Sequence, residues 1–323
     1  MDIDLSVLRL LEREKEIPFD ELVTIIEAAI LAAYFKHIGA TEKSARAELD
    51  RKTGHVTIHK PVFNEEGEQV SEENVTPEGF GRVAAYAAKQ VIAQRMREIS
   101  DEGLLGEFKG KEGDIVAGVI QQGTRSNMVY VNLGSIEAMM PPEEQVPGED
   151  YSHGRRIRVY VTSVQKGPRG PQITVSRTHP GLIRKLFALE VPEVANGLVE
   201  IASVAREAGH RTKIAVIAKQ PGINAKGACI GELGQRVRAV SAELNEEKID
   251  VVDFSEDLPK FVAHALSPAR VSSARLVDAA LRAVRVTVPE FQLSLAIGKE
   301  GQNARLAAKL TGAKIDIQPD TGA

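Results

Sequence analysis

Two stretches of this 323-residue chain repeat one pattern: Ile230-Gly231-Glu232-Leu233-Gly234-Gln235 and Ile297-Gly298-Lys299-Glu300-Gly301-Gln302. The second copy begins 67 positions after the first, at 297 instead of 230. Each copy is followed by a stretch typical of a helix and then by an apolar strand, at 247–251 and at 313–317. One unit of helix, Gly-x-x-Gly loop, helix and strand has therefore been used twice.

A Gly-x-x-Gly loop in this setting is typical of a KH domain, where it clamps the backbone of about four nucleotides. Two glycines let the main chain approach a sugar-phosphate closely, and the second helix directs its N-terminal amides toward anions. Glycines that merely join two helices would explain one copy easily and two matched copies poorly. The repeat therefore favours RNA binding, with the clamps at Gly231, Gly234, Gly298 and Gly301.

Polar residues around the loops are the further candidates for RNA contacts. The second copy offers Lys299, Gln302, Asn303 and Arg305 as donors to phosphate or base edges. The first loop contains no cation, so the positive charge that binds phosphate there must come from Lys226, Arg236 or Arg238. We therefore expect the second copy to be the better phosphate clamp.

The middle segment changes to the short apolar runs of a β structure. Five such runs occur, separated by turns that contain Gly or Pro: 115–120, 128–131, 136–139, 157–161 and 173–176. Five strands in about 70 residues suit a small Greek-key barrel of the OB type. Arg125 and Tyr130 are its candidate RNA-binding residues, and Tyr130 either stacks a base or belongs to the barrel core.

The first third is expected to be α+β. Apolar spacing predicts a helix over about 2–14, with Ile3, Val7, Leu10 and Leu11 on its buried face, and a second helix that ends near Gly39. Apolar and polar residues alternate in 45–50 and in 55–59, on either side of a turn that contains Gly, and this pattern predicts a hairpin.

A long helix should close this first third. Thr76, Pro77 and Glu78 are typical of a helix start, with a capping hydroxyl, a proline at the first position and an early acid. Gly103 is expected to end the helix.

Charge is distributed unevenly along the chain, whose formal net charge is −4. Residues 1–105 carry 13 Lys and Arg against 20 Asp and Glu, a net of −7, whereas 106–179 carry +1 and 180–323 carry +2. The stretch 151–189 contains eight cations and no acid: Arg155, Arg156, Arg158, Lys166, Arg169, Arg177, Arg184 and Lys185. This block is either a surface that meets phosphates or a solvated basic face.

Several classes of protein are not indicated. Cys229 is the single cysteine, which excludes an internal disulfide and is most simply a buried small apolar residue. The seven histidines show no metal-ligand spacing, and paired acids such as Glu246 and Glu247 lie in expected loops, where solvation explains them. We therefore predict neither an enzyme nor a bound metal or cofactor. The acidic N-terminus and the short apolar runs predict a cytoplasmic protein without membrane contact.

Taken together, these motifs resemble the NusA family of bacterial transcription elongation and termination factors. The resemblance is carried by Gly227-Ala228-Cys229-Ile230-Gly231 and 243–252 in the first copy, by the link 265–271, and by 293–307 in the second copy. Residues 81–95 match the last helix of the family's N-terminal domain. The resemblance covers essentially the whole chain and identifies it as a member.

The resemblance implies a multidomain fold of four parts. They are an α+β N-terminal domain that binds RNA polymerase (1–105), an OB barrel (106–179), and two tandem α+β KH domains (180–255 and 256–323). Acidic C-terminal repeats, which some members carry, are expected to be absent.

The resemblance also implies a function. The acidic N-terminal domain would dock on RNA polymerase core near the flap of its β subunit. The barrel and KH domains would receive nascent single-stranded RNA and so control pausing, termination and, with other factors, antitermination. A monomer is expected.

Two other functions compete with this one. A stand-alone RNA-binding protein of translation or RNA decay would use the same modules without polymerase. A nuclease would need clustered carboxylates or histidines, which the sequence does not show.

Overall fold

The protein is described by a computed structural model that covers residues 3–15, 17–39, 44–64, 68–121, 127–168 and 170–320. The chain forms two compact units. The first comprises residues 1–106 with the short segment 167–171, and the second comprises the remainder. Each unit is described by itself below. No described helix is both long enough and apolar enough to cross a membrane.

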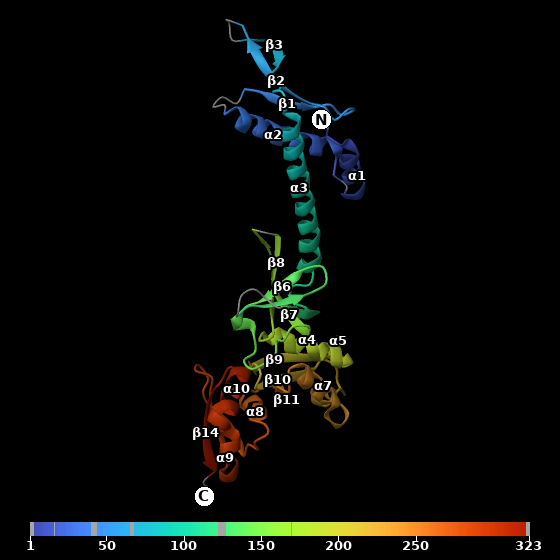
Figure 1. Cartoon of the computed structure of the whole chain (residues 1–323). Coiled ribbons are helices and arrows are strands. Elements are labelled where there is room, and N and C mark those ends of the chain that lie inside the picture. Colours follow the sequence, from blue (N-terminus) through green and yellow to red (C-terminus); the bar gives the residue numbers. More distant parts are fainter. Residues whose placement is uncertain are drawn as a thin grey trace. The chain divides into compact units, whose positions relative to one another are not determined.

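The N-terminal unit packs three helices against a three-stranded sheet (Figure 1, blue to teal). The helices are α1 (Leu5–Lys15), α2 (Phe19–Ile38) and α3 (Gly81–Lys109), and the strands are β1 (Arg46–Leu49), β2 (Val56–Phe63) and β3 (Gln69–Asn74). The sheet order is β1-β2-β3. Because β1 pairs with β2 antiparallel, with Leu49 opposite Val56, the predicted hairpin is confirmed. The third strand was not predicted, since all its residues are exposed and carry no apolar alternation.

The buried face of α1 differs from the predicted one. Leu8 and Leu11 are buried with Ile3, whereas Val7 and Leu10 are exposed. The reason is the start of the helix: Asp4 accepts a hydrogen bond from the amide of Ser6 at 2.9 Å, so α1 begins at Leu5. Ile3 therefore precedes the helix, and a stripe counted from Ile3 selects the buried Leu11 but also the exposed Val7 and Leu10.

Both predicted ends of α3 were wrong. The Thr76 hydroxyl donates to Asn74 and accepts from the amide of Ile58 instead of capping the helix, which begins at Gly81. Gly103 lies inside α3, which continues to Lys109. An interior glycine costs only about 1 kcal/mol relative to alanine. Phe108 lies in the last turn of the helix, beyond that glycine, and its ring is buried. Burial of this ring favours continuation of the helix past Gly103.

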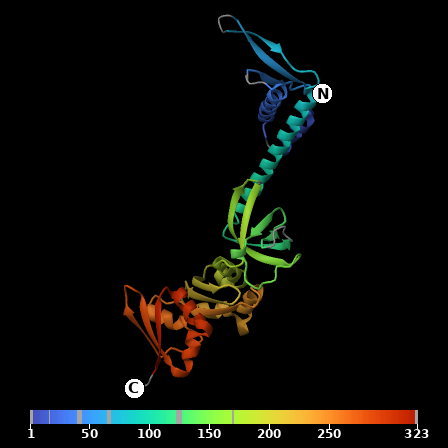
Figure 2. The same cartoon turned by 60° about the vertical axis from the view of Figure 1, so that its left-hand side comes forward.

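The predicted five strands form a closed barrel with the order β4-β5-β6-β8-β7 (Figure 2, green). Their bounds are β4 (Ile115–Gln121), β5 (Val129–Asn132), β6 (Glu137–Met140), β7 (Arg156–Gly167) and β8 (Gly170–Ser176), with the short helix η1 (Pro142–Glu144) between β6 and β7. The side chains of Ile120, Val131, Met140, Val159 and Ile173 fill the interior. The barrel predicted from the spacing of apolar runs is confirmed.

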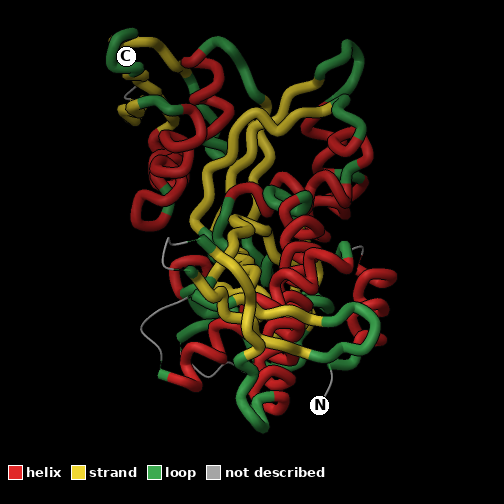
Figure 3. Tube along the Cα trace, turned by 90° about the horizontal axis from the view of Figure 1, so that it is seen from above, coloured by secondary structure: helices red, strands yellow, loops and turns green. Residues whose placement is uncertain are grey.

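After the barrel come the two copies of the repeat, called here the first and second repeat, each with helices and one three-stranded sheet. Figure 3 colours the helices red and the strands yellow. The first repeat contains α4 (Pro180–Glu190), α5 (Pro192–Ala195), β9 (Val199–Glu207), β10 (Arg211–Ala218), α6 (Ala225–Ile230), η2 (Glu232–Gly234), α7 (Gln235–Glu243) and β11 (Lys248–Asp253). The second contains α8 (Leu258–Ala265), β12 (Ser273–Asp278), β13 (Ala283–Pro289), η3 (Glu290–Gln292), α9 (Leu293–Ile297), η4 (Lys299–Gly301), α10 (Gln302–Thr311) and β14 (Lys314–Asp320).

The two sheets share one topology. The last strand of each repeat runs parallel to the middle strand, and the first strand runs antiparallel to it. The predicted helix–loop–helix–strand unit is therefore present twice.

The two repeats share one hydrophobic core. Ala205, Ala215 and Val252 of the first repeat belong to the same buried cluster as Phe261 of α8 and Leu306 of α10. Because separating the repeats would expose this apolar surface to water, they form one packed body and not two domains on a flexible link.

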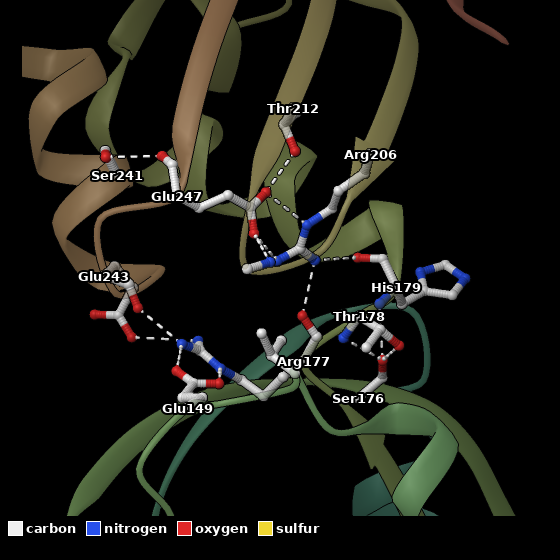
Figure 4. A network of polar contacts seen from close by, with 12 residues as sticks. Glu149, Ser176, Arg177, Thr178, His179, Arg206, Thr212, Ser241, Glu243 and Glu247 are labelled. Carbon is white, nitrogen blue, oxygen red and sulfur yellow. Dashed lines mark hydrogen bonds and ion pairs between the residues drawn. The ribbon is translucent and has the colours of Figure 1, made fainter. Parts of the chain in front are cut away.

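Arginine pairs join the barrel to the first repeat (Figure 4). The Arg177 side chain is 2% exposed, and its Nε and Nη2 each donate to one oxygen of the Glu149 carboxylate. It also donates to the carbonyls of Arg158 at 2.9 Å and Glu243 at 2.8 Å. Glu149 follows the barrel strand β6, and Glu243 ends α7, so one buried cation connects the two elements.

A second buried pair lies directly above the first in Figure 4. Arg206 donates to both oxygens of Glu247 at 2.9 and 2.8 Å and also to the Arg177 carbonyl at 2.8 Å. Burial raises the pKa of Glu247, but the hydrogen bonds from Arg206, Thr212 and the Gly209 amide outweigh it and hold that pKa below its usual range. The prediction that Glu247 is a solvated loop acid was therefore wrong.

These pairs also explain the block of cations at 151–189. Five of the eight have partners in the structure: Arg155 with Asp150, Arg158 with Glu243, Arg177 with Glu149, Lys185 with Asp114, and Arg184 with the carbonyl of Ile201. Arg156 and Lys166 are exposed, and Arg169 lies outside the described residues. Both interpretations of the block, as a surface that meets phosphates and as a solvated basic face, stay predictions, but the charge of Arg177 belongs to neither because its side chain is buried.

We predict that Glu149→Gln destabilises the second unit, because it removes the charge that binds two nitrogens of the buried Arg177 guanidinium and leaves only the Glu243 carboxylate, 3.7 Å away. Removing one partner of a buried pair costs about 3–5 kcal/mol, whereas an exposed pair is worth about 0–1 kcal/mol. Calorimetric unfolding of the full chain measures the loss. The control is Glu200→Gln, which breaks the exposed pair of Glu200 with Lys219. Equal unfolding temperatures for the two variants would contradict a structural role of the buried pair.

Candidate nucleic-acid interface

The first Gly-x-x-Gly loop follows a short capped helix. The side chain of Asn224 accepts a hydrogen bond from the Gly227 amide at 2.9 Å and so starts α6. Gly231 then turns the chain with φ 73° and ψ 174°, and Gly234 leads into α7 with φ 77° and ψ 16°. The first of these conformations is accessible essentially only to glycine.

The second loop is a conformational copy of the first. Gly298 has φ 77° and ψ 170°, and Gly301 has φ 73° and ψ 11°. The residue before the second glycine is left-handed in both loops, Leu233 with φ 48° and Glu300 with φ 53°. The repeat found in the sequence is thus reproduced to within a few degrees in the backbone.

The tips of the two loops differ in chemistry. Leu233 is 88% exposed at the tip of the first loop. In the second loop Lys299 and Glu300 are both exposed. Non-glycine residues held in left-handed conformations are strained and tend to occur at functional sites. The loops therefore expose their backbones in a conformation that the surrounding structure must maintain.

Two of the candidate residues, Asn303 and Arg236, make hydrogen bonds within the protein that hold the loops. Asn303 is fully buried and donates to the carbonyls of Leu266 and Ala296, each at 3.0 Å. The prediction that Asn303 is an RNA donor is therefore contradicted, because both of its amide hydrogens are bound inside the protein. Its oxygen is buried without a partner among the described residues.

Arg236, 67 positions before Asn303, holds the first loop in the same way. It donates to the Ala228 carbonyl at 2.8 Å and pairs with Glu193 at 2.8 Å. A Cβ on Gly231 would lie 2.7 Å from the Arg236 side chain, and one on Gly298 would lie 2.8 Å from Asn303. The first glycine of each loop is thus required by close packing as well as by its φ angle.

Other candidates lie on the surface around the loops. Arg238 and Lys299 are exposed, and Lys226 is half-buried. Arg305 and Gln302 both contact Glu207 of the first repeat, at 2.7 and 2.9 Å. The structure therefore places Arg238, Lys299 and Arg305 at the loops but gives Arg305 an internal partner that the sequence did not reveal.

Of the two candidate RNA-binding residues on the barrel, the structure describes Tyr130 alone. Tyr130 is half-buried on β5, opposite Gln121 and Met139 in the neighbouring strands. Arg125 lies outside the described residues.

Cys229 is fully buried beside the first loop, in the core that also contains Val240 and Leu244. Burial raises the pKa of its thiol to about 11, so the thiol is neutral near pH 7. The interpretation of Cys229 as a small apolar residue is consistent with this environment. Among the described residues, no group of three His, Cys, Asp or Glu side chains could hold a metal ion.

Comparison with known protein families assigns all four parts of the chain. Residues 5–62 and 60–102 match the NusA N-terminal domain, and residues 109–176 match the S1 RNA binding domain. Residues 177–254 and 258–323 match the NusA-like first and second KH domains.

Two relatives are similar over nearly their whole length. The transcription termination/antitermination protein NusA of Mycobacterium tuberculosis is 54% identical over 327 residues, which cover 99% of this chain and 94% of that protein. The protein of the same name from Bacillus subtilis is 46% identical, covering 99% of this chain and 91% of its own length. The chain belongs to the NusA family. This membership confirms the predicted fold class, with an S1-type OB barrel before two tandem KH domains.

A solved structure, that of the N-terminal domain of NusA from Bacillus subtilis, also matches. It is 32% identical, covers 29% of this chain and 93% of that domain, and has a TM-score of 0.25.

We predict that Gly298→Ala weakens RNA binding about tenfold and lowers the unfolding free energy by about 1–3 kcal/mol, since it combines a strained φ with a steric clash. Fluorescence anisotropy with a labelled single-stranded RNA and calorimetric unfolding measure the two effects. The control is Gly197→Ala, which has a similar φ of 71° but open space around its Cβ. If the control weakened RNA binding as much, the close packing at Gly298 would be irrelevant.

Proposed function

We propose that this protein is an RNA-binding transcription factor that docks on RNA polymerase and controls pausing, termination and antitermination through the nascent RNA. The observation that carries the proposal is the pair of matched Gly-x-x-Gly loops held in one packed body. The relatives named as transcription termination/antitermination proteins, similar over almost the entire chain, support the transcriptional role.

We assign polymerase binding and RNA binding to different segments of the chain, with the bounds predicted from the sequence. Residues 1–105 would bind polymerase core at the β-flap region, and 106–179, 180–255 and 256–323 would bind RNA as barrel and KH domains. The net charge of −7 in the first segment, against positive values in the others, supports this division, because acidic surfaces are repelled by RNA. We propose that the protein acts as a monomer in the cytoplasm and carries no catalysis.

RNA contacts are proposed at the loop backbones of Gly231, Gly234, Gly298 and Gly301, which have positive φ angles and, as glycines, no side chain between the main chain and a ligand. Lys226, Arg238 and Lys299 would meet phosphates, and Tyr130 and Arg125 would extend the surface onto the barrel. Arg236 would act by bracing the first loop.

The first test is the lifetime of a hairpin-stabilised pause, measured with core polymerase from the same bacterium. We expect the full chain to lengthen the pause and residues 106–323 to leave it unchanged, because the truncation lacks the proposed docking domain. If both bind RNA and neither changes the pause, the protein would instead be a general RNA-binding protein of translation or RNA decay.

A second prediction concerns the second loop. Replacing Lys299 and Glu300 by two aspartates should weaken RNA binding about tenfold or more, because the exposed loop then repels phosphate. Co-sedimentation with core polymerase should not change. The matched control is Lys260→Asp, the same change of charge at an exposed position of α8. Equal RNA affinity of the loop variant and the control would remove the second loop from the interface.

A further inference from the structure

Each Gly-x-x-Gly loop is followed by the same two polar residues. Gln235 and Arg238 follow the first loop, and Gln302 and Arg305 follow the second at the same offset of 67. In both copies the arginine lies beside the second glycine. Its Nη1 is 3.1 Å from the place of a Cβ on Gly234 in the first copy, and 4.0 Å from that on Gly301 in the second.

One carboxylate distinguishes the two copies. Glu207, the last residue of β9 in the first repeat, accepts hydrogen bonds from Arg305 Nε at 2.7 Å and from Gln302 Nε2 at 2.9 Å. Gln235 and Arg238 make no hydrogen bond or ion pair through their side chains within the part of the chain that the structure describes. The glutamine and arginine are therefore bound to a carboxylate in the second repeat, whereas their counterparts in the first repeat are available to a ligand.

The position of Glu207 is fixed by the packing of the repeats. The core shared by β9, β10, α8 and α10 holds the end of β9 against the start of α10. Arg305 also donates through Nη1 to the Glu300 carbonyl of the loop at 3.1 Å, so its guanidinium lies between the carboxylate and the loop. The hydrogen bond from Arg305 lowers the pKa of Glu207, which keeps the carboxylate charged at neutral pH.

We propose that Glu207 is an internal competitor of RNA at the second loop: its carboxylate occupies Arg305 and Gln302, whose counterparts at the first loop are available to phosphate. The inference rests on the proposed function and adds a residue that sets the affinity of one clamp. An RNA phosphate reaches Arg305 only by displacing Glu207 or by sharing the guanidinium with it. In either case a negative charge remains near the phosphate and weakens its binding.

The consequence reverses the ranking expected from sequence. The second loop has more donors nearby, yet its arginine is neutralised by an acid from the other repeat. Arg238 should therefore contribute more to RNA affinity than Arg305, although the two occupy equivalent positions.

The test replaces Glu207 by glutamine in the full chain. Glutamine keeps the shape, and an amide flip of Gln302 preserves both hydrogen bonds while the charge is lost. A labelled single-stranded RNA of mixed sequence, about 20 nucleotides long, spans two clamps of about four nucleotides each. We expect Glu207→Gln to bind it about threefold to tenfold more tightly, the effect of removing one charge near a phosphate in a largely aqueous setting. The slope of log affinity against log salt should steepen by about 0.7, the value for one further phosphate of a single strand.

Three comparisons make the result specific. Glu207→Gln should have no effect when Arg305 is already alanine, because the competitor then has no arginine to release. Glu48→Gln, which removes the same charge from an exposed pair in the N-terminal unit, should leave the affinity unchanged. Arg238→Ala should weaken binding more than Arg305→Ala.

The outcomes are distinct. Unchanged or weaker RNA binding by Glu207→Gln, with wild-type binding intact and equal thermal unfolding, would overturn the inference and leave the proposed function standing. A lower unfolding temperature without tighter RNA binding would make Glu207 a purely structural link between the repeats. If the wild-type chain bound no RNA, the proposed function would fail, and the inference with it.

Discussion

The two repeats that contain the Gly-x-x-Gly loops depend on a steric constraint at one glycine in each loop. Gly231 and Gly298 adopt a conformation in which a Cβ would collide with Arg236 or Asn303, only 2.7–2.8 Å away. The helices on either side of each loop can therefore approach closely and leave the loop backbone exposed. The hydrogen bonds of Arg236 and Asn303 to neighbouring carbonyls hold the chain in this strained conformation.

Burial of charge is the second organising feature. Arg177 and Arg206 lie inside the protein, each bound to a glutamate that is distant in the sequence and to carbonyls of neighbouring segments. Such pairs contribute little net stability compared with apolar packing but impose one geometry, since any rearrangement leaves a charge unpaired. We attribute to them the alignment of barrel and first repeat, while the shared apolar core aligns the two repeats.

Local pattern was sufficient to predict much of the fold. The 67-residue offset revealed both repeats, and apolar runs bounded by turns located every barrel strand, because these signals depend on neighbours in the sequence. Predictions failed where distant contacts decide the outcome. Glu247 looks like a loop acid until Arg206 is found beside it, α3 passes Gly103 because Phe108 is buried beyond it, and Asn303 faces inward to carbonyls from two other segments. No spacing rule places Glu207 next to Arg305 across 98 residues.

The fully buried Cys229 gives the protein an internal reporter. Its sulfur lies in the core under the first loop, and its neutral thiol reacts slowly as long as that core stays closed. Because it is the single cysteine in the chain, the rate at which a thiol reagent labels the protein measures how often this one repeat opens. The opening of the core beneath the first clamp can thus be followed in the unmodified sequence.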